Sequence, residues 1–236
     1  MNVISFPFIC NNAAMSKQKR GYKLMPKRTF FRLDEDKREK VIRAAINEFR
    51  INGYENAKVG TIAKNAGIAN GSIYQYFDDK QEFFLYCVNW TVENFIREQD
   101  RLMPLVGVDL YEYFQSGLPD RVAYWKQEPE LAMFAHDLTN GVIAFPPGEA
   151  NTVRDLHGAH IPKLVANAQK WGSLRNDTDD GLLTLIITGV VREVEEHLYR
   201  RAEANKFVLS EEQVIENAEQ LRRIIEILNN GVANKN

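Results

Sequence analysis

The length, composition and charge of the chain exclude several classes of protein. Its 236 residues are 44% hydrophobic and 26% charged with a net charge of -2, which is typical of a globular chain forming one large domain or two modest ones. A disulfide-stapled miniprotein and a wholly disordered chain are therefore excluded.

Neither a zinc site nor a membrane segment is indicated. Cys10 and Cys87 belong to no CxxC or Cys/His cluster, which also fits a reducing, cytoplasmic location. No run of about 18 apolar residues occurs, and no basic region precedes the short apolar opening. We therefore expect neither a spanning helix nor a signal peptide.

The charge is unevenly distributed along the chain. Residues 1–80 contain 15 Lys and Arg against 8 Asp and Glu, whereas residues 81–236 contain 15 against 24. The excess of positive charge in the first third favours contact with a polyanion such as nucleic acid. The alternative is a solvated basic tail, because seven of these cations precede the first acid, Asp34.

The first segments are an arm and a helix. Residues 1–33 have no helical or strand periodicity and predict a flexible basic arm. An acidic triplet, 34–36, suits the first turn of a helix, and apolar residues recur at helical spacing over 37–51. Asn-Gly dipeptides, which we expect as C-caps, follow this and two later helical runs, at 52–53, 140–141 and 230–231.

Two short segments, 59–65 and 70–77, have the spacing of a helix-turn-helix motif. Ala63 permits close approach of two helices, and Gly67 supplies the positive φ that a short turn needs. Ile73 then fills the wedge between the helices. A helical hairpin that binds no DNA is the alternative.

The second helix of the motif is expected to present a polar face without acidic residues. That face comprises Asn70, Gly71, Ser72, Tyr74, Gln75 and Tyr76. These groups can donate hydrogen bonds or let backbone come near, and Lys80 lies within reach of a phosphate. Residues 34–80 are therefore predicted to form a helix-turn-helix DNA-binding domain.

The remainder of the chain reads as helical. A long helix begins at Lys80 and stops at Met103-Pro104, and further helices are expected at 109–127, 128–140, 149–171 (with a kink at Pro162), 178–203 and 210–229. No period-2 strand pattern occurs. The fold class is therefore all-α, with a small DNA-binding head and a larger helical domain over 81–236.

The second domain contains material for a ligand pocket and an interface. The candidate pocket residues are Trp90, Phe95, Tyr113, Phe114, Trp125 and Phe134, with plain core packing as the alternative. His157 and His160 have no further ligands at suitable spacing, so no metal or cofactor is expected. The segment 182–191 is apolar nearly all round and predicts half of a four-helix dimer interface with 210–229, the alternative being intrachain core.

A set of short motifs lies in fixed order within residues 37–88. They are Ala44-Ala45, Phe49, Gly53-Tyr54, Ile62-Ala63, Ala66-Gly67-Ile68, Gly71-Ser72-Ile73-Tyr74, Tyr76-Phe77 and Lys80. Together they resemble the DNA-binding domain of the TetR/AcrR family of bacterial transcriptional regulators. The resemblance implies a three-helix head on a helical body that holds a small-molecule pocket and forms a homodimer through its last two helices.

The resemblance also implies roles for individual residues. It places Asn70, Gly71 and Tyr74 near base edges. It places the phosphate or backbone contacts at Gln75, Tyr76, Lys80, Gly60 and Thr61. The chain departs from the family where Lys58 replaces a capping Ser or Thr, where Thr61 replaces an acid, and where Asn70 replaces Lys. Lys58 is a candidate for an added phosphate contact, and Asn70 leaves the operator sequence open.

The predicted function is a sequence-specific DNA-binding regulator, a repressor released from a palindromic operator by a small-molecule effector. An enzyme is disfavoured because the sequence has no GxSxG, HExxH or phosphate-cradling glycine-rich motif. A helical module that binds an acidic protein or a membrane surface would explain the charge distribution. Such a module would not explain the spacing of Ala63, Gly67 and Ile73.

Overall fold

The computed structural model describes residues 26–102, 123–147, 161–172, 174–208 and 210–230. Within these ranges every regular element is a helix, as the sequence predicts. None of the described helices has the length and apolar character needed to cross a bilayer.

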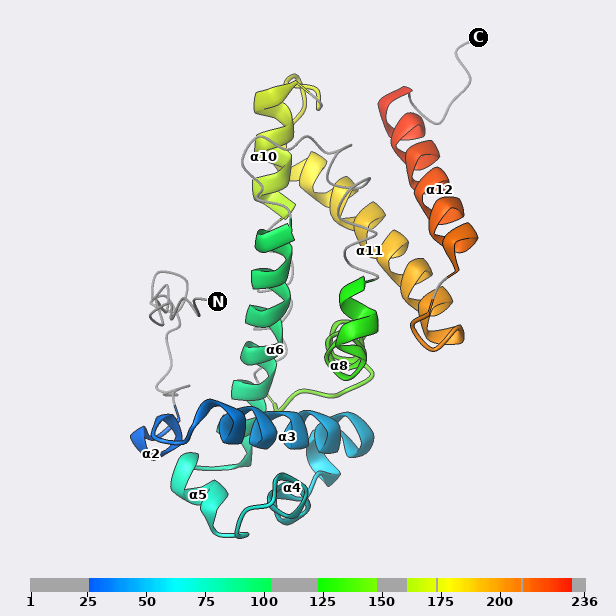
Figure 1. Cartoon of the computed structure of the whole chain (residues 1–236). Coiled ribbons are helices and arrows are strands. Elements are labelled where there is room, and N and C mark those ends of the chain that lie inside the picture. Colours follow the sequence, from blue (N-terminus) through cyan, green and yellow to red (C-terminus); the bar gives the residue numbers. More distant parts are fainter. Residues whose placement is uncertain (1–25, 103–122, 148–160, 173, 209, 231–236) are drawn as a thin grey trace, which may run out of the picture.

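The first part of the chain forms a helical head. It consists of α2 (Arg28–Phe31), α3 (Glu35–Asn56), α4 (Val59–Ala66), α5 (Ser72–Tyr76) and the first turns of α6 (Lys80–Leu102). In Figure 1, α3 lies across the head, α4 and α5 lie on its outer side, and α6 rises from it toward the body. Asp34 caps α3 by accepting a 2.9 Å hydrogen bond from the Lys37 N–H, so the predicted helix start is confirmed.

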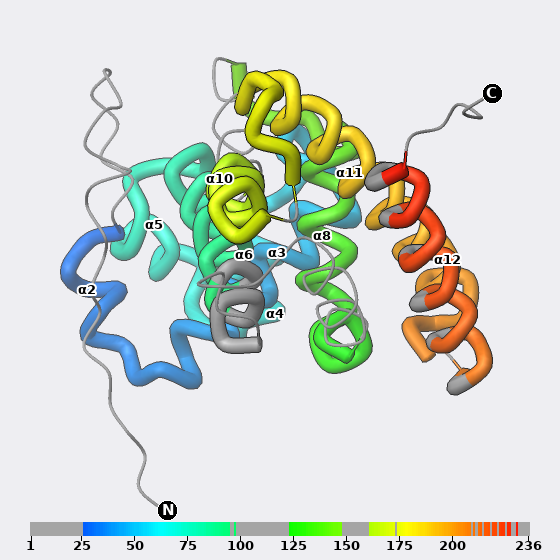
Figure 2. Tube along the Cα trace, turned by 90° about the horizontal axis from the view of Figure 1, so that it is seen from above, coloured from blue at the N-terminus to red at the C-terminus, as the bar shows by residue number. Residues whose placement is uncertain are grey.

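The body consists of four further helices. They are α8 (Pro129–Thr139), α10 (Ile161–Trp171), α11 (Asp180–Ala204) and α12 (Glu211–Asn230). α8 packs on both α3 and α6, and α10 packs on α11. Seen from above, α11 and α12 lie side by side at one edge of the molecule, with α12 outermost (Figure 2).

The hydrophobic core crosses the predicted boundary between residues 80 and 81. Phe83 and Phe84, from the first turns of α6, are fully buried in the same cluster as Phe49 of α3. Phe134 of α8 belongs to this cluster as well. A second cluster joins α10 and α11. The head is therefore packed against α8 as well as continuous with α6.

Several local predictions can be compared with the structure. Gly141 follows α8 with a φ of +71°, so the cap predicted there is confirmed. Gly53, with a φ of +69° and a ψ of 170°, makes a kink inside α3 in place of the predicted cap, and the C-cap of α3 is Ala57. Gly231 lies outside the described residues. Pro162 occupies the second position of the described part of α10, and the expected helix before it lies outside the described residues.

The expectation of a flexible arm is wrong for residues 26–33. Arg28–Phe31 is helical, and Phe30 is completely buried among head residues. The many basic residues around Phe30 suggest a solvated arm, but the aromatic side chain of Phe30 packs into the core and orders the segment. Residues 1–25, and most of the helix expected at 109–127, lie outside the described residues.

Candidate nucleic-acid interface

The predicted helix-turn-helix is present between α4 and α5. α4 ends at Gly67, whose φ of +71° and ψ of 31° are left-handed, and the Ile68 N–H returns to the Ala63 carbonyl at 3.0 Å. Ala63 is fully buried, and Ile73 is 1% exposed. The steric roles predicted for Ala63, Gly67 and Ile73 are therefore confirmed.

The N-terminus of α4 is capped by a residue that the sequence did not single out. The backbone N–H of Lys58 donates to Oε1 of Glu48 at 2.9 Å, and Glu48 is only 7% exposed. This carboxylate satisfies the N–H of the N-cap residue itself, whereas a Ser or Thr side chain at position 58 would accept from an N–H inside the first turn of α4. The sequence signal for this role is the position of Glu48, an acid within the apolar stripe of 37–51.

Most of the predicted DNA-binding residues lie on the outer surface of the head. Lys58, Asn70, Gly71, Tyr74 and Gln75 are exposed, and Gly60, Thr61, Ser72 and Lys80 are half-buried. Figure 1 shows α4 and α5 at the end of the molecule farthest from α12. No described helix or loop covers this surface.

Gly60 and Asn70 are brought together across the motif. A Cβ atom at Gly60 would lie 3.2 Å from Oδ1 of Asn70, which is tighter than an ordinary contact. The absence of a side chain at the start of α4 thus lets the Asn70 amide lie against it.

Tyr76 does not share the exposed face. It is 9% exposed, and its ring centroid lies 5.7 Å from that of Phe30. Residues three apart on a helix share a face, so Tyr76 follows Ile73 into the core. The prediction that its side chain faces outward is wrong, and its phosphate contact stays a prediction.

Lys80 has a structural role in the head. Its ammonium donates to the carbonyl of Glu55 at 2.9 Å and to that of Ala57 at 3.4 Å, and it lies 4.8 Å from the ring centroid of Tyr54. A cation at the C-terminal end of α3 is favourable there. Two of its three donors are therefore used within the head, and the predicted phosphate contact can use the third.

A small cavity lies between α8 and α11 in the body. Its volume is about 60 Å³, and the residues that line it are Trp125, Ala132, Ala135, His136, Thr139, Asn140, Arg192, Glu195, Glu196 and Tyr199. Of the predicted pocket residues, Trp125 lines this cavity. Phe134 is instead buried in the head cluster, and Trp90 packs against the same cluster. The side chains of Phe95, Tyr113 and Phe114 lie outside the described residues.

Polar groups meet in the wall of this cavity. Nε2 of His136 lies 2.7 Å from Oε2 of Glu196, and the imidazole stacks on the Tyr199 ring with centroids 3.6 Å apart. The Tyr199 hydroxyl is buried, and no described residue forms a hydrogen bond with it. Burial and neighbouring carboxylates raise the pKa of Tyr199, so the hydroxyl stays protonated and can donate.

No group of three or more potential metal ligands occurs among the described residues. His157 and His160 lie outside them. His136, which appeared isolated along the sequence, meets Glu196 through the packing of α8 on α11.

Comparison with known proteins finds a family model that matches the head. Residues 41–87 match the model for bacterial regulatory proteins of the tetR family. Two proteins of Bacillus subtilis (strain 168) are similar: an uncharacterized HTH-type transcriptional regulator, YdgC, is 41% identical over 49 residues, and a fatty acid metabolism regulator protein is 35% identical over 60 residues. The matches span only 25% and 31% of these relatives.

Solved structures extend the similarity of fold beyond the head. A TetR family transcriptional regulator from Chloroflexus aurantiacus J-10-FL is 28% identical with a TM-score of 0.59, and the match covers 87% of this chain and 95% of that one. The transcriptional regulator FadR from Bacillus subtilis, solved in complex with stearoyl-CoA, is 17% identical with a TM-score of 0.60. That match covers 79% of this chain and 96% of FadR, and shows the fold alone.

Proposed function

We propose that this chain, whose head belongs to the TetR family of bacterial regulatory proteins, is a sequence-specific DNA-binding transcriptional regulator. The observation that carries the proposal is the exposed polar surface at α5, supported from behind by the buried Ala63 and Ile73 and reached through the left-handed turn at Gly67. A helix presented in this way can enter the major groove, where base edges carry a distinguishable pattern of donors and acceptors.

The exposed residues suit both kinds of DNA contact. The amides of Asn70 and Gln75 can each donate and accept, as recognition of an adenine edge or a phosphate requires. Tyr74 is 54% exposed and presents its phenol beyond the backbone. Lys58 places a cation at the start of α4, where a phosphate would also meet backbone N–H groups.

Replacement of Tyr74 by Ala tests the interface. Because Tyr74 is exposed, the variant is expected to fold as the parent while binding a palindromic duplex, selected from a random pool, at least about tenfold more weakly. Trp171→Ala is the matched control, since Trp171 is 58% exposed but lies on α10 in the body. Equal binding of the parent to selected and scrambled duplexes would favour the non-specific interaction module instead.

The body is proposed to form a homodimer through α11 and α12. Five large apolar side chains on these helices are exposed in the single chain: Leu182, Leu185, Ile186, Ile215 and Ile227. Large exposed apolar residues on both of these adjacent helices favour a four-helix interface with a second copy. Two heads held at a fixed separation would then read a near-palindromic operator.

The cavity between α8 and α11 is the proposed effector site. The Tyr199 hydroxyl, which has no hydrogen-bond partner among the described residues, and the paired His136 and Glu196 offer polar contacts beside the Trp125 ring. We propose that the effector binds in the cytoplasm and binds best to a dimer whose two heads no longer match successive major grooves of the operator. Effector binding would then release the protein from DNA, so the chain would act as a repressor.

Titration with and without operator tests this coupling. An effector found by a thermal-shift screen is expected to bind the operator-bound dimer more weakly, by the same factor by which it weakens operator binding. Identical dissociation constants with and without operator would contradict release by an effector.

A further inference from the structure

Helix α5, which carries the proposed DNA-binding surface, is too short to be stable by its own hydrogen bonds. α5 has five residues, and a single turn is costly to form because several dihedral angles are fixed for one hydrogen bond. Its last internal bond runs from the Phe77 N–H to the Ile73 carbonyl at 2.9 Å. The carbonyls left without a partner inside the helix are those of Tyr74, Gln75, Tyr76 and Phe77.

Lys27 binds three of these four carbonyls. Its backbone N–H donates to the Tyr76 carbonyl at 2.7 Å. Its ammonium donates to the carbonyl of Tyr74 at 3.0 Å and to that of Phe77 at 3.4 Å. The positive charge also stands at the C-terminal end of a helix, where the backbone dipoles favour a cation.

Thr29 and Phe30 complete the contact. The Thr29 hydroxyl donates to the carbonyl of Gln75, the fourth of the set. Phe30 is completely buried, with its ring centroid 5.0 Å from that of Phe77 and 5.7 Å from that of Tyr76. Lys27 and Thr29 therefore satisfy every open carbonyl of α5, and Phe30 anchors this segment in the core beneath the helix.

We propose that Lys27, Thr29 and Phe30, here named the α5 clamp, are positioning residues of the DNA-binding surface. The clamp holds α5 at the angle at which Tyr74 and Gln75 project, so its loss lets α5 fray and lowers operator affinity. Lys27 accordingly serves α5 rather than acting as a free cation of a basic arm, and its ion pair with Asp78 at 2.8 Å keeps it in place. The inference rests on the proposed DNA-binding function.

Thr29→Val is the sharpest variant because it keeps the shape of the side chain and removes the hydroxyl. We expect it to weaken binding of the selected duplex by about two- to tenfold, the effect of one net hydrogen bond. Thr29→Ser restores the hydroxyl and is expected to restore affinity. The melting temperature of both variants should stay close to that of the parent, since Thr29 is exposed.

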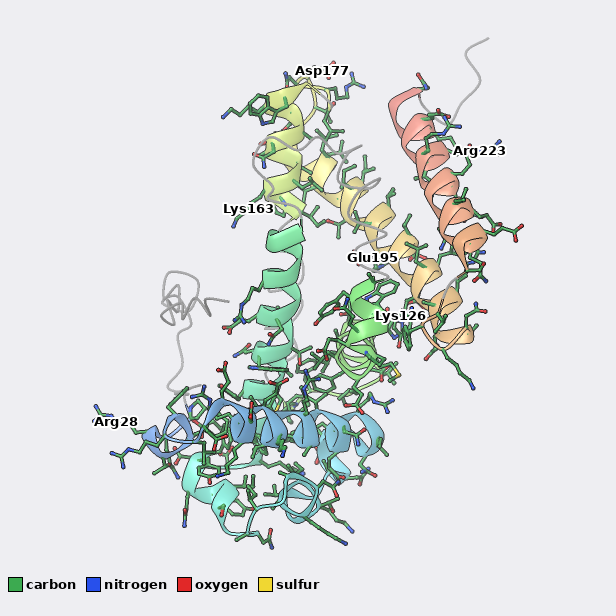
Figure 3. All side chains as sticks on the ribbon, in the orientation of Figure 1. Arg28, Lys126, Lys163, Asp177, Glu195 and Arg223 are labelled. Atoms are coloured by element: carbon green, nitrogen blue, oxygen red, sulfur yellow. The ribbon has the colours of Figure 1, made fainter. Side chains whose placement is uncertain are left out.

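Lys27→Met removes the ammonium bonds and leaves the backbone bond. Arg28→Met is its matched control, because it removes the same charge from the next residue. The Arg28 side chain points away from α5 at the outer edge of the head (Figure 3), and within the described residues it makes no hydrogen bond with α5. We expect Lys27→Met to lose more affinity than Arg28→Met.

Two further readouts separate positioning from direct contact. Loss of a phosphate contact made by a cation would reduce the slope of log affinity against log salt by about one, whereas Lys27→Met is expected to leave the slope unchanged. Amide hydrogen exchange of the free protein is expected to quicken in the peptide covering 72–77 for Thr29→Val and Lys27→Met, and to stay at the parent rate for Arg28→Met.

The outcomes distinguish the clamp from the function on which it rests. Unchanged exchange at 72–77 in both clamp variants overturns the clamp. Faster exchange with unchanged operator affinity overturns its role in DNA binding. If the unsubstituted protein binds no selected duplex, the proposed function fails, while the exchange measurement still decides whether the clamp holds α5.

Discussion

Arg43 of α3 binds Glu128 at the start of α8 through two hydrogen bonds. The two terminal guanidinium nitrogens lie 2.7 Å and 3.0 Å from the two carboxylate oxygens, and Nε lies 2.7 Å from Oε1 of Glu39. The bonds to Glu128 raise the pKa of Arg43, so the guanidinium keeps its charge at every accessible pH. Because α8 also bears His136 at the cavity, this pair connects the head with the proposed effector site.

Loss of this pair is expected to weaken the coupling between head and body. In a double-mutant cycle of Arg43→Met and Glu128→Gln, followed by urea unfolding, we expect an interaction energy of about 1 kcal/mol, since both groups are partly exposed. Glu39→Gln is the control, because it removes a partner within α3 alone. An interaction energy below about 0.3 kcal/mol would mean that the Arg43–Glu128 pair does not stabilise the contact between α3 and α8.

Glu48 is expected to stabilise the head through the start of α4. Glu48→Ala removes the acceptor of the Lys58 N–H and should lower the free energy of unfolding by about 1 kcal/mol or more. Glu48→Gln keeps an acceptor oxygen and should recover part of that loss. If both variants unfold at the same urea concentration as the parent, this hydrogen bond does not contribute measurably to the free energy of unfolding.

Lys80 is expected to contribute to stability as well as to any contact with DNA. Lys80→Met removes the donor to the carbonyls at the end of α3 and should lower the melting temperature of the free protein. Lys64→Met is the control, since Lys64 is an exposed cation on the neighbouring α4. Equal melting temperatures for the two variants would leave Lys80 without a structural role.

These residues show which features the sequence predicts and which depend on tertiary packing. The periodicity of 37–51 and the turn at Gly67 are local, and both were predicted correctly. Tyr76 was misplaced because its polar hydroxyl suggested exposure, whereas its position three residues after Ile73 directs the ring into the core. The contacts of Lys27 and Lys80 join segments distant in sequence, so no local pattern reveals them, whereas the place of Glu48 in the apolar stripe of 37–51 signals that this acid is buried.

The contact of Glu196 with His136 predicts a dependence of stability on pH. Burial alone would raise the pKa of Glu196, but the hydrogen bonds from His136 and Arg200 outweigh it and hold the pKa below the ordinary value of 4.5. An acid whose pKa is lower in the folded state stabilises the fold above its unfolded pKa, and this contribution is lost as pH falls through the folded pKa.

Glu196→Gln is therefore expected to be less stable than the parent at pH 7. The difference between the two should shrink when urea unfolding is repeated at pH values stepped downward from about 4.5. Glu193→Gln provides a control on the exposed side of α11, where the carboxylate pairs only with the adjacent Arg192 among the described residues. A difference that stays constant down to the acid limit would contradict this account of Glu196.

Leu185 is expected to lie at the centre of the proposed dimer interface. It is 71% exposed in the single chain, so Leu185→Glu should leave the fold of one subunit intact while placing two like charges across the symmetric contact. Light scattering at micromolar concentration should then report a monomer, and binding to a palindromic duplex should weaken by at least about a hundredfold because the second head is no longer tethered. Val142→Glu is the matched control, since Val142 is 69% exposed after α8 and should remain dimeric. If the parent itself scatters as a monomer, the exposed faces of α11 and α12 need a different explanation.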